Sequence, residues 1–278
     1  MSATCWTCAA DAGPCRSLGS LPFAECERCG LVFRDDPAAG DVQAVYAEGD
    51  YAEERGSHYD SDEEEGDRRR DARVRLRWLA RHAAGGRLLD VGAAGGAFVL
   101  EAGRAGYDAV GIEPTPAFAA RARERVGVAV RETTIEDAAL APESLDVVTM
   151  WHVLEHVPHP RAQLERVAQA MRPGAVLALE VPNFGSAVAA RMGPRWPSLQ
   201  PAVHVNQFAP RSLRALLESS GFRPVEIGTT ALTPYLPLRG RLAPRHVAAR
   251  VKAAAWLRTP ASTHPSGHEL LRAIAVRP

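Results

Sequence analysis

The chain has 278 residues, of which 46% are hydrophobic, and 33 basic side chains balance 33 acidic ones at pH 7. This length and composition suit a soluble globular protein with one main domain and a small accessory one. The neutral charge disfavours a general nucleic-acid binder. No run approaches about eighteen consecutive apolar residues and the N-terminus lacks the layout of a signal peptide, so we expect no membrane span and a cytoplasmic location.

Two pairs of cysteines stand near the N-terminus, Cys5-x-x-Cys8 and Cys26-x-x-Cys29. Two such pairs at this separation can place four thiolates tetrahedrally around Zn²⁺. Disulfides or buried free cysteines are the alternatives, and a cytoplasmic chain rarely keeps disulfides. Four protein ligands leave no open position on the metal. We therefore expect a structural zinc ribbon over residues 1–35, a segment too short to build its own core.

Residues 36–67 combine three tyrosines with Gly, Asp and Glu and end in an acidic run. Such a stretch cannot fold by itself, so it is either a solvated linker or a lid that orders over a site. The acidic run favours a linker, whereas the tyrosines could cover a ligand or simply pack on the domain surface. A helix with an apolar face is predicted next, over residues 68–82.

The segment from Arg87 to Phe98 predicts a strand that ends in an acid, a turn of small residues, and the start of a helix. Small residues let a backbone approach a ligand closely, and the N–H groups at the helix start offer donors to it. The dinucleotide fingerprint fits poorly, because alanine stands at positions 94 and 97. Close packing of a helix on a sheet is the alternative meaning of such a turn.

A second short buried strand, residues 109–113, ends in Glu113, twenty-three residues after Asp90. In doubly wound nucleotide folds an acid about twenty residues on accepts hydrogen bonds from ribose hydroxyls. Glu113 is therefore the candidate ribose ligand, and a solvated surface glutamate is the alternative. The remaining predicted elements are strands at residues 126–130, 145–150 and 176–181, a helix at 211–220, and a hairpin of 222–227 with 269–276.

The loop after Asp90 carries Gly92, Ala94 and Gly96 at alternate positions, and residues 154–160 read Leu-Glu-His-Val-Pro-His-Pro. The first segment resembles the Asp-x-Gly-x-Gly-x-Gly loop of class I methyltransferases that use S-adenosylmethionine, with alanine in one glycine slot. The second resembles the Leu-Glu-His motif of their small-molecule branch, which includes quinone-ring O-methylases and sugar methylases. This resemblance implies an α/β, Rossmann-like fold with a seven-stranded, mostly parallel sheet over residues 68–278, behind the zinc ribbon.

The resemblance also implies S-adenosylmethionine as the cofactor and roles for particular residues. Asp90 would organise the loop and the methionine amine, and Glu113 would bind the ribose. Ile135 with Glu136 would lie at the adenine, although a helix start at Thr134 is the alternative there. The predicted cofactor-binding residues are Asp90, Gly92, Ala93, Ala94, Gly96, Glu113, Ile135, Glu136 and Trp151.

Histidines are the candidates for the catalytic step. Methyl transfer needs alignment of nucleophile and sulfonium, plus a base if the acceptor starts protonated, and histidine suits that base. His152 and His156 would share one face of a helical turn and lead the candidates, with His204 as second choice. A divalent cation held by His152, Glu155 and His156 is one alternative. A structural role for His156 at a helix start is another.

We therefore predict an S-adenosylmethionine-dependent methyltransferase whose partner is a small polar metabolite, a nucleotide-linked sugar or a natural-product scaffold. Two other functions stay open. One is a zinc-ribbon adaptor with an inactive methyltransferase-like domain, which the intact Asp90 and Glu113 argue against. The other is an RNA or protein methyltransferase, which the neutral charge disfavours, so no nucleic-acid partner is expected.

Overall fold

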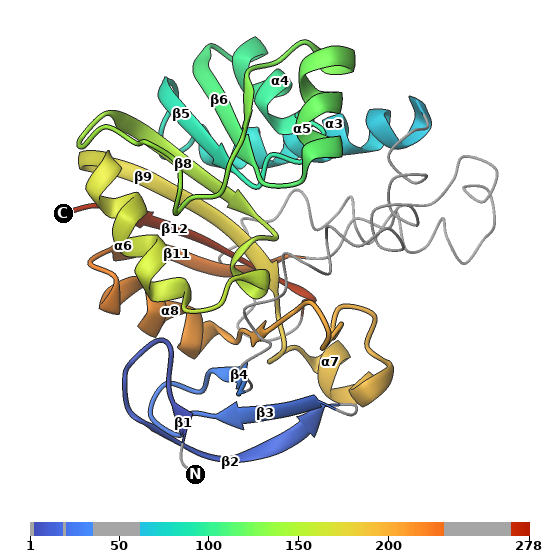
Figure 1. The fold of residues 1–278 in the computed structure, drawn as a ribbon, viewed down its shortest axis with the longest axis vertical. Coiled ribbons are helices and arrows are strands. Elements are labelled where there is room, and N and C mark those ends of the chain that lie inside the picture. Colours follow the sequence, from blue (N-terminus) through green and yellow to red (C-terminus); the bar gives the residue numbers. More distant parts are fainter. Residues whose placement is uncertain (1–2, 19–20, 36–61, 231–267) are drawn as a thin grey trace.

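The computed structural model describes residues 3–18, 21–35, 62–230 and 268–278. Figure 1 shows them as a small β-sheet at the N-terminal end and a larger α/β part built on a second sheet. The predicted linker or lid, with its three tyrosines, falls largely on residues 36–61 and lies outside the described residues.

The small sheet has five strands in the order β1-β2-β3-β4-β10, with antiparallel pairs throughout. Its strands are β1 (Ala3–Thr4), β2 (Asp11–Leu18), β3 (Leu21–Glu25), β4 (Val32–Arg34) and β10 (Asn206–Gln207). The first four belong to the predicted ribbon, whereas β10 belongs to the main domain. The ribbon sheet is therefore completed by a strand from the far half of the chain.

The large sheet has seven strands in the order β11-β12-β9-β8-β5-β6-β7. They are β5 (Gly86–Val91), β6 (Tyr107–Glu113), β7 (Val130–Glu132), β8 (Leu145–Trp151), β9 (Met171–Pro182), β11 (Arg223–Thr230) and β12 (Leu270–Val276). The five strands from β5 to β9 pair in parallel, and β12 is antiparallel to both of its neighbours. The predicted mostly parallel, seven-stranded sheet is confirmed.

Helices cover both faces of this sheet. The longer ones are α3 (Asp62–Leu79), α4 (Ala97–Arg104), α6 (Pro160–Ala170) and α8 (Pro210–Ser219). Successive side chains of a strand point to opposite faces. Leu88 accordingly packs in one buried cluster with Leu79 of α3, whereas Leu89 packs in another with Leu164 of α6 and Leu213 of α8. The strands are buried on both sides, which explains their nearly continuous apolar sequence.

Two predicted boundaries are wrong. Helix α3 begins at Asp62, not at Arg68, so part of the acidic run predicted as linker is helical; acids at a helix start are favoured by the helix dipole. The strand predicted at residues 126–130 is shorter and later. The π-helix η2 (Ala122–Val126) occupies its start, and Gly127 ends that helix at a φ of 74° before β7 begins.

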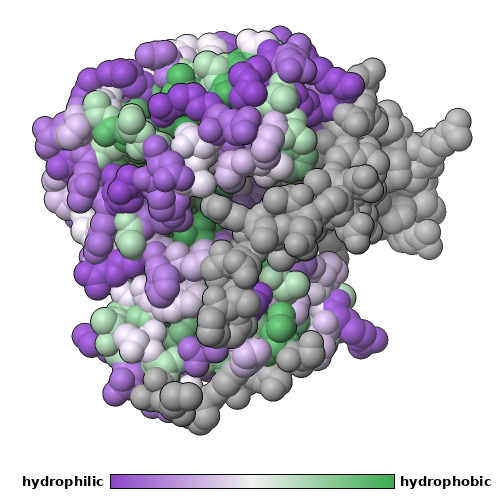
Figure 2. Space-filling view, viewed as in Figure 1, coloured by the Kyte–Doolittle hydropathy of each residue, from purple (hydrophilic) through white to green (hydrophobic). Residues whose placement is uncertain are grey.

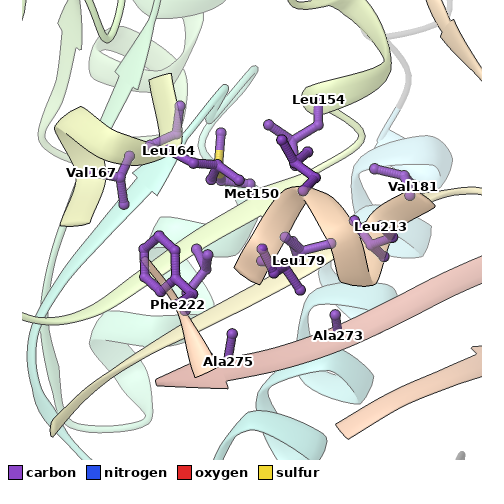
Figure 3. Close-up of a cluster of buried hydrophobic side chains, with 14 of the residues drawn as sticks. Met150, Leu154, Leu164, Val167, Leu179, Val181, Leu213, Phe222, Ala273 and Ala275 are labelled. Atoms are coloured by element: carbon purple, nitrogen blue, oxygen red, sulfur yellow. The ribbon is translucent and has the colours of Figure 1, made fainter. Parts of the chain in front are cut away.

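Figure 3 shows the part of the core between the sheet and helices α6 and α8, where Met150, Leu164, Val167 and Phe222 point toward one another. All four are at most 3% exposed. Burying one such side chain contributes about 1.5–3 kcal/mol. This packing fixes the positions of β8 and β9, whose ends carry the site.

The view in Figure 2 shows hydrophilic residues over most of the described surface, with apolar ones scattered among them. Among the described residues, the large hydrophobic side chain that stands out as exposed is Val225, at 48%. In the same part of the chain, no helix has the length and apolar character needed to cross a membrane. Smaller helices α5 (Pro116–Arg121), η3 (Leu154–His156), α7 (Ala187–Met192) and η4 (Gly193–Arg195) complete the fold.

Candidate active site

A cavity of about 800 Å³ opens at the carboxyl ends of the parallel strands. Asp90 lies next to the end of β5, Glu113 is the last residue of β6, and Trp151 is the last of β8. All three line the cavity. Ligands of doubly wound sheets bind at this edge, and the volume is within the range of small-molecule sites.

The turn after β5 forms one wall of the cavity through Gly92, Ala93 and Ala94. Gly92 has a φ of 72°, and a Cβ there would lie 2.7 Å from the side chain of Val153, so only glycine fits. Gly96 differs from these residues. It precedes α4, a Cβ on it would lie 2.6 Å from the nearest side chain, and it does not line the cavity. Of the predicted loop residues, Gly96 therefore serves helix packing.

Glu113 is only 6% exposed, which rules out the solvated surface glutamate. One carboxylate oxygen accepts the backbone N–H of Ala94 and the other accepts that of Thr115, each at 2.9 Å. Burial raises the pKa of this carboxyl, while the two backbone donors oppose the rise. Because each oxygen can accept more than one hydrogen bond, the carboxylate is held in place and can still accept donors from a ligand.

Asp90 is 1% exposed and lies beside the buried Thr149 of β8. The Thr149 hydroxyl donates a hydrogen bond of 2.6 Å to its Oδ1. Burial raises the pKa of Asp90 to about 7, against the opposing effects of this hydrogen bond and of Arg75. A cationic ligand near Asp90 would favour its ionised form, so the site suits a positively charged group.

The segment predicted to lie at the adenine does line the cavity, through Ile135 and Glu136. Ile135 is 4% exposed. The Thr134 hydroxyl accepts the N–H of Asp137 at 3.2 Å, as a helix cap would, but residues 135–137 form a single turn and no helix follows. The Glu136 side chain accepts a hydrogen bond from Gln163 of α6. The apolar Ile135 is therefore the residue that can cover a flat ring.

Trp151 is 7% exposed and forms part of the cavity lining. Its ring centroid lies 5.1 Å from that of Phe98, and Cζ of Arg75 lies over the ring, 4.9 Å from its centroid. Its buried Nε1 has no hydrogen-bond acceptor among the described residues. Because Nε1 itself is buried, Trp151 contributes ring surface to the cavity lining and not a hydrogen-bond donor.

His152 follows β8 with a left-handed backbone, at a φ of 58°. Its Nδ1 lies 3.2 Å from Oε1 of Glu155, and its Nε2 lies 3.2 Å from Oε1 of Glu180. Burial favours the neutral ring, but these two hydrogen bonds outweigh it and raise the pKa of His152 to about 9. An imidazolium cannot accept a proton, which argues against His152 as the base. The predicted helical face shared with His156 is also wrong, because η3 begins at Leu154.

Glu180 of β9 is the centre of a charge network that the sequence interpretation missed. Its carboxylate, 1% exposed, accepts hydrogen bonds from Arg75 of α3 and Arg272 of β12. Burial alone would raise its pKa. The charges of Arg272 and Arg75 and the hydrogen bond from His152 instead hold the pKa of Glu180 well below its usual range. The only sequence signal was an acid inside an otherwise apolar strand.

His156 and His204 form another wall of the cavity, with ring centroids 4.6 Å apart at 71°. Nδ1 of His156 lies 3.1 Å from the Val203 carbonyl, and Nδ1 of His204 lies 2.8 Å from the Ser198 carbonyl. A carbonyl only accepts, so each Nδ1 carries the proton and each Nε2 is the acceptor nitrogen of its ring. Burial lowers the pKa of His156 to about 3, which keeps this ring neutral.

Glu155 joins this pair and is 1% exposed. One ligand atom from each of Glu155, His156 and His204 lies within 4.8 Å of the others, and Oε2 of Glu155 has no hydrogen-bond partner among the described residues. Two imidazoles and a carboxylate are a donor set that divalent metals accept. If a cation binds here, it is held by this set. The predicted set with His152 fits less well, because that ring is protonated.

The chain is similar in sequence to known methyltransferase domains. Residues 64–227 match a protein family described as a methyltransferase domain. The chain belongs to this family. Over 191 residues it is 31% identical to a ubiquinone biosynthesis O-methyltransferase of Xanthomonas euvesicatoria, covering 62% of this chain and 77% of that protein. A Hahella chejuensis protein of the same name is 41% identical over 112 residues, or 37% of this chain and 47% of that protein.

The chain spans about half the length of several of the curated relatives it matches. Two solved structures show the same fold. An Archaeoglobus fulgidus SAM-dependent methyltransferase is 21% identical, with a TM-score of 0.54, over 75% of this chain and 94% of that one. A Haemonchus contortus phosphoethanolamine N-methyltransferase in complex with S-adenosylhomocysteine is 18% identical, with a TM-score of 0.51, over 73% of this chain and 52% of that one. The expected class I methyltransferase fold is confirmed.

The four predicted zinc ligands do come together in this chain. The Sγ atoms of Cys5 and Cys29 lie 3.5 Å apart, as do those of Cys8 and Cys26, and all four lie within 4.8 Å of one another. Sulfur atoms in a disulfide would lie about 2.05 Å apart. Tetrahedral ligands at about 2.3 Å from Zn²⁺ would lie about 3.8 Å apart. The cysteines are free, and their spacing fits a structural zinc ion better than a disulfide.

Each cysteine pair sits on the same kind of tight turn. The N–H of Ala9 donates to the Cys5 carbonyl at 3.0 Å, and the N–H of Gly30 donates to the Cys26 carbonyl at 2.7 Å. Gly30 has a φ of 77°, which its lack of a Cβ permits. Cys5 lies beside Cys29. The hydrogen bond from Cys29 lowers the pKa of the Cys5 thiol to about 5, against the effect of burial. A thiolate at this position suits a metal ligand.

Proposed function

We propose that the protein transfers a methyl group from S-adenosylmethionine to a small polar metabolite. The observation that carries this proposal is the meeting of two buried acids, Asp90 and Glu113, with a glycine-requiring turn in a cavity that is also lined by the neutral His156 and by His204. The bound cofactor would supply an electrophilic methyl group on a sulfonium. The protein has to bind it, exclude water, and align an acceptor with that methyl group.

The residues of the first wall fit this cofactor. Glu113, fixed by two backbone donors, can accept ribose hydroxyls, and Asp90 can face the ammonium of the methionine part. Ile135 can cover the adenine ring. These assignments follow from chemistry and position together: acceptors where the ligand has donors, and an apolar surface for its ring.

His156 and His204 are the residues that can act on the acceptor. Backbone carbonyls accept from Nδ1–H of both rings, so Nε2 of the neutral His156 ring can accept a hydrogen bond or a proton. Glu155 would stabilise an imidazolium formed on either ring, because its carboxylate lies beside both. The pKa of His156, lowered to about 3, makes this residue better suited to orient an acceptor proton than to remove one.

A nucleotide-linked sugar or a natural-product scaffold remains our first choice of acceptor. Arginines 75 and 272 and the protonated His152 line the cavity, and a polar or anionic group would bind well beside them. A second candidate, O-methylation of a quinone-type ring, is favoured by the sequence similarity to ubiquinone biosynthesis O-methyltransferases. The two acceptor classes can be distinguished by testing which of them supports conversion of S-adenosylmethionine to S-adenosylhomocysteine.

The first experiment is calorimetric titration of S-adenosylmethionine into the zinc-loaded protein and into Glu113→Ala. We expect micromolar binding that the substitution weakens by at least about tenfold, or about 1.4 kcal/mol. Glu218→Ala, which removes an exposed glutamate from α8, is the matched control and should leave the affinity unchanged. No heat at any accessible concentration would contradict the enzyme and favour an inactive adaptor.

If the cofactor binds, acceptors are tested by mass spectrometry for methylated product. Nucleoside-diphosphate sugars and catechols form the two arms. His156→Gln and His204→Gln should lower turnover with the accepted class while leaving the affinity for S-adenosylmethionine within about threefold. An acceptor that both variants methylate at the normal rate would contradict the role given to these histidines.

A further inference from the structure

The zinc ribbon is joined to the wall of the cavity that carries the histidines. Strand β4 of the ribbon pairs with β3 on one edge and with β10 of the main domain on the other. Asn206 pairs with Phe33, and Gln207 pairs with Val32. In Figure 1, β4 is the strand of the small sheet nearest the larger α/β part. The ladder therefore runs from the cysteine turn at residues 26–29 directly into the segment that follows His204.

Further bonds from the ribbon hold the same segment. The backbone N–H of Arg34 donates to the Val205 carbonyl at 2.9 Å, and its guanidinium donates to the Ala202 carbonyl at 3.0 Å. On the other side, Arg211 of α8 donates to the carbonyls of Glu27 and Arg28, inside the second cysteine turn. Hydrogen bonds of this kind fix a backbone that would otherwise be a loop.

Asn206 links β10 to the turn at residues 154–157, which carries Glu155 and His156. Its side-chain amide, 1% exposed, donates to the carbonyl of Leu154 at 2.9 Å and to that of Val157 at 2.7 Å. These two carbonyls flank Glu155 and His156. The Nδ1 of His156 in turn donates to the carbonyl of Val203, three residues before β10 begins. The orientation of both histidines thus depends on where residues 203–206 lie.

The ribbon and the domain also share one core. Buried Cys26, Leu31 and Phe33 belong to the same hydrophobic cluster as Leu154 and Phe208. Trp6 lies between the first two cysteines. Its ring centroid is 5.1 Å from that of Phe33 and 4.7 Å from that of His159, which follows the turn at residues 154–157. A segment of about thirty residues without a core of its own holds this arrangement only while its metal site is intact.

We propose that the zinc ribbon positions the part of the cavity lining that carries Glu155, His156 and His204, called here the acceptor wall. Asn206 is the positioning residue that couples β4 to the turn bearing Glu155 and His156. A bound metal ion would stabilise the folded ribbon. The pairing of β4 with β10 would then hold His156 and His204 in fixed positions. The hydrogen bonds from the ribbon lead to the acceptor wall, whereas β5 and β6 share the hydrophobic cluster with the ribbon through Leu89, Val91 and Ile112. Zinc therefore acts more strongly on the acceptor wall than on the cofactor wall.

Hydrogen exchange of the full-length chain tests the coupling. The zinc-loaded protein is compared with the same protein stripped of metal by a chelator, and exchange is followed by peptide mass spectrometry. We expect exchange to rise at least about tenfold in residues 152–158 and 203–208, and by less than about twofold in residues 86–113. The proposal is overturned if residues 152–158 keep their protection, or if protection falls equally in residues 86–113, since zinc would then stabilise the whole domain.

Asn206→Ala tests the transmission while zinc stays bound. We expect one zinc per chain, normal exchange in residues 21–34, and faster exchange in residues 152–158. Nitrogen NMR of the imidazoles gives a second measurement: the His156 ring should lose its fixed Nδ1–H tautomer. Tyr107→Phe is the matched control, because it removes one side chain-to-carbonyl hydrogen bond, of 2.5 Å to Ala83, from a buried tyrosine on the cofactor side.

An unchanged His156 tautomer in Asn206→Ala would overturn the role of Asn206, as would the same changes in Tyr107→Phe. The proposal goes beyond the proposed function, and these measurements need neither cofactor nor acceptor. Titration of S-adenosylmethionine into the same samples keeps the two apart. Lost binding in the unaltered protein would contradict the methyltransferase activity, whereas unchanged exchange on zinc removal would contradict only the coupling.

Discussion

Asp90, Glu113 and the turn between them come from one stretch of the chain, β5 to β6, whereas the acceptor wall, formed by the cavity lining around Glu180 and the histidines, joins α3, β9, β12 and the segment before β10. On the cofactor wall Glu113 is held by the nearby backbone of Ala94 and Thr115, although Asp90 is held by the more distant Thr149. Glu180, in contrast, is held by Arg75 and Arg272, which lie far from it in the chain. The cofactor wall is thus largely a local motif, and the acceptor wall is a product of the whole fold.

This difference predicts that changes to the acceptor wall lower the stability of the protein and that changes to the cofactor wall lower chiefly the affinity for the cofactor. The largest expected effect is that of Glu180→Gln. It leaves the guanidinium groups of Arg75 and Arg272 and the imidazolium of His152 without their shared carboxylate. Removing one partner of a buried ion pair costs about 3–5 kcal/mol. The free energy of unfolding in urea at pH 7 measures this loss.

Glu218→Gln provides the control for that measurement. Glu218 pairs with Arg214 on the surface of α8, where both side chains are 55% exposed. Its substitution should change the free energy of unfolding by less than about 0.5 kcal/mol. A loss of under about 1 kcal/mol for Glu180→Gln would mean that the network is not what holds the acceptor wall.

The same contrast explains what the sequence could and could not predict. The strand–turn–helix pattern around Asp90 and the acid of Glu113 are local signals, and the structure places both residues in the cavity as expected. The cysteine pairs are also local, and they meet. Glu180 escaped prediction because its partners come from other elements, and nothing in an apolar strand shows which charges it will meet. The protonation of His152 was missed for the same reason.

The role of β10 was equally invisible in the sequence. A two-residue strand has no periodicity, and its pairing with β4 depends on the docking of the ribbon. The predicted division at residue 35 follows the change in composition along the chain, which says nothing of a strand that returns from the main domain. Local chemistry could be predicted, and long-range pairing could not.

The second largest effect is expected on the cofactor wall, for Thr149→Val. This change keeps the shape of a side chain with 0% exposure and removes the hydroxyl that donates to Asp90 at 2.6 Å. Without that donor the pKa of Asp90 rises above its present value of about 7, and a smaller fraction is ionised at neutral pH. We expect the affinity for S-adenosylmethionine at pH 7 to fall by about three- to tenfold. Calorimetric titration measures this change.

The affinity of Thr149→Val should recover as the pH is raised to 8, because Asp90 then ionises despite the missing donor. Ser220→Ala, which removes a buried hydroxyl that donates to the Leu216 carbonyl away from the cavity, is the matched control for loss of a hydroxyl. An affinity for the cofactor that stays constant in Thr149→Val from pH 6 to pH 8 would show that the charge of Asp90 does not enter binding.

A smaller effect is expected from the pH dependence of stability on the acceptor wall. The pKa of His152 is raised to about 9 in the folded protein, from about 6.5 in the unfolded chain. Its contribution is therefore fully present below pH 6.5 and is lost as the pH rises through 9. His152 is 37% exposed, so solvent screening reduces that contribution. His152→Gln should flatten the fall in unfolding free energy over this range, as measured by urea titrations at pH 6, 7.5 and 9.

Glu180 has a depressed pKa, so its contribution is lost only in acid and does not overlap with this range. Because Asp90, with a pKa of about 7, also titrates near this range, the part of the fall that His152→Gln removes is the part assigned to His152. An equally steep fall in His152→Gln would mean that another group titrates there. Urea titrations of Glu218→Gln, whose substitution lies far from the network, should reproduce the pH profile of the unaltered protein.

The smallest effect concerns the one alanine in the glycine pattern of the cofactor wall. Ala94 has a φ of 44°, in the left-handed region, where a residue with a Cβ costs about 1–2 kcal/mol relative to glycine. Ala94→Gly removes this strain but adds freedom to the unfolded chain, which offsets about 0.4–1 kcal/mol. The backbone N–H that Ala94 donates to Glu113 is unchanged by the substitution. We expect a gain of about 0.5 kcal/mol in unfolding free energy and an affinity for S-adenosylmethionine within about twofold. A loss of more than about 1 kcal/mol would show that the methyl group of Ala94 packs in the turn, and that the cofactor wall, too, depends on contacts its motif does not reveal.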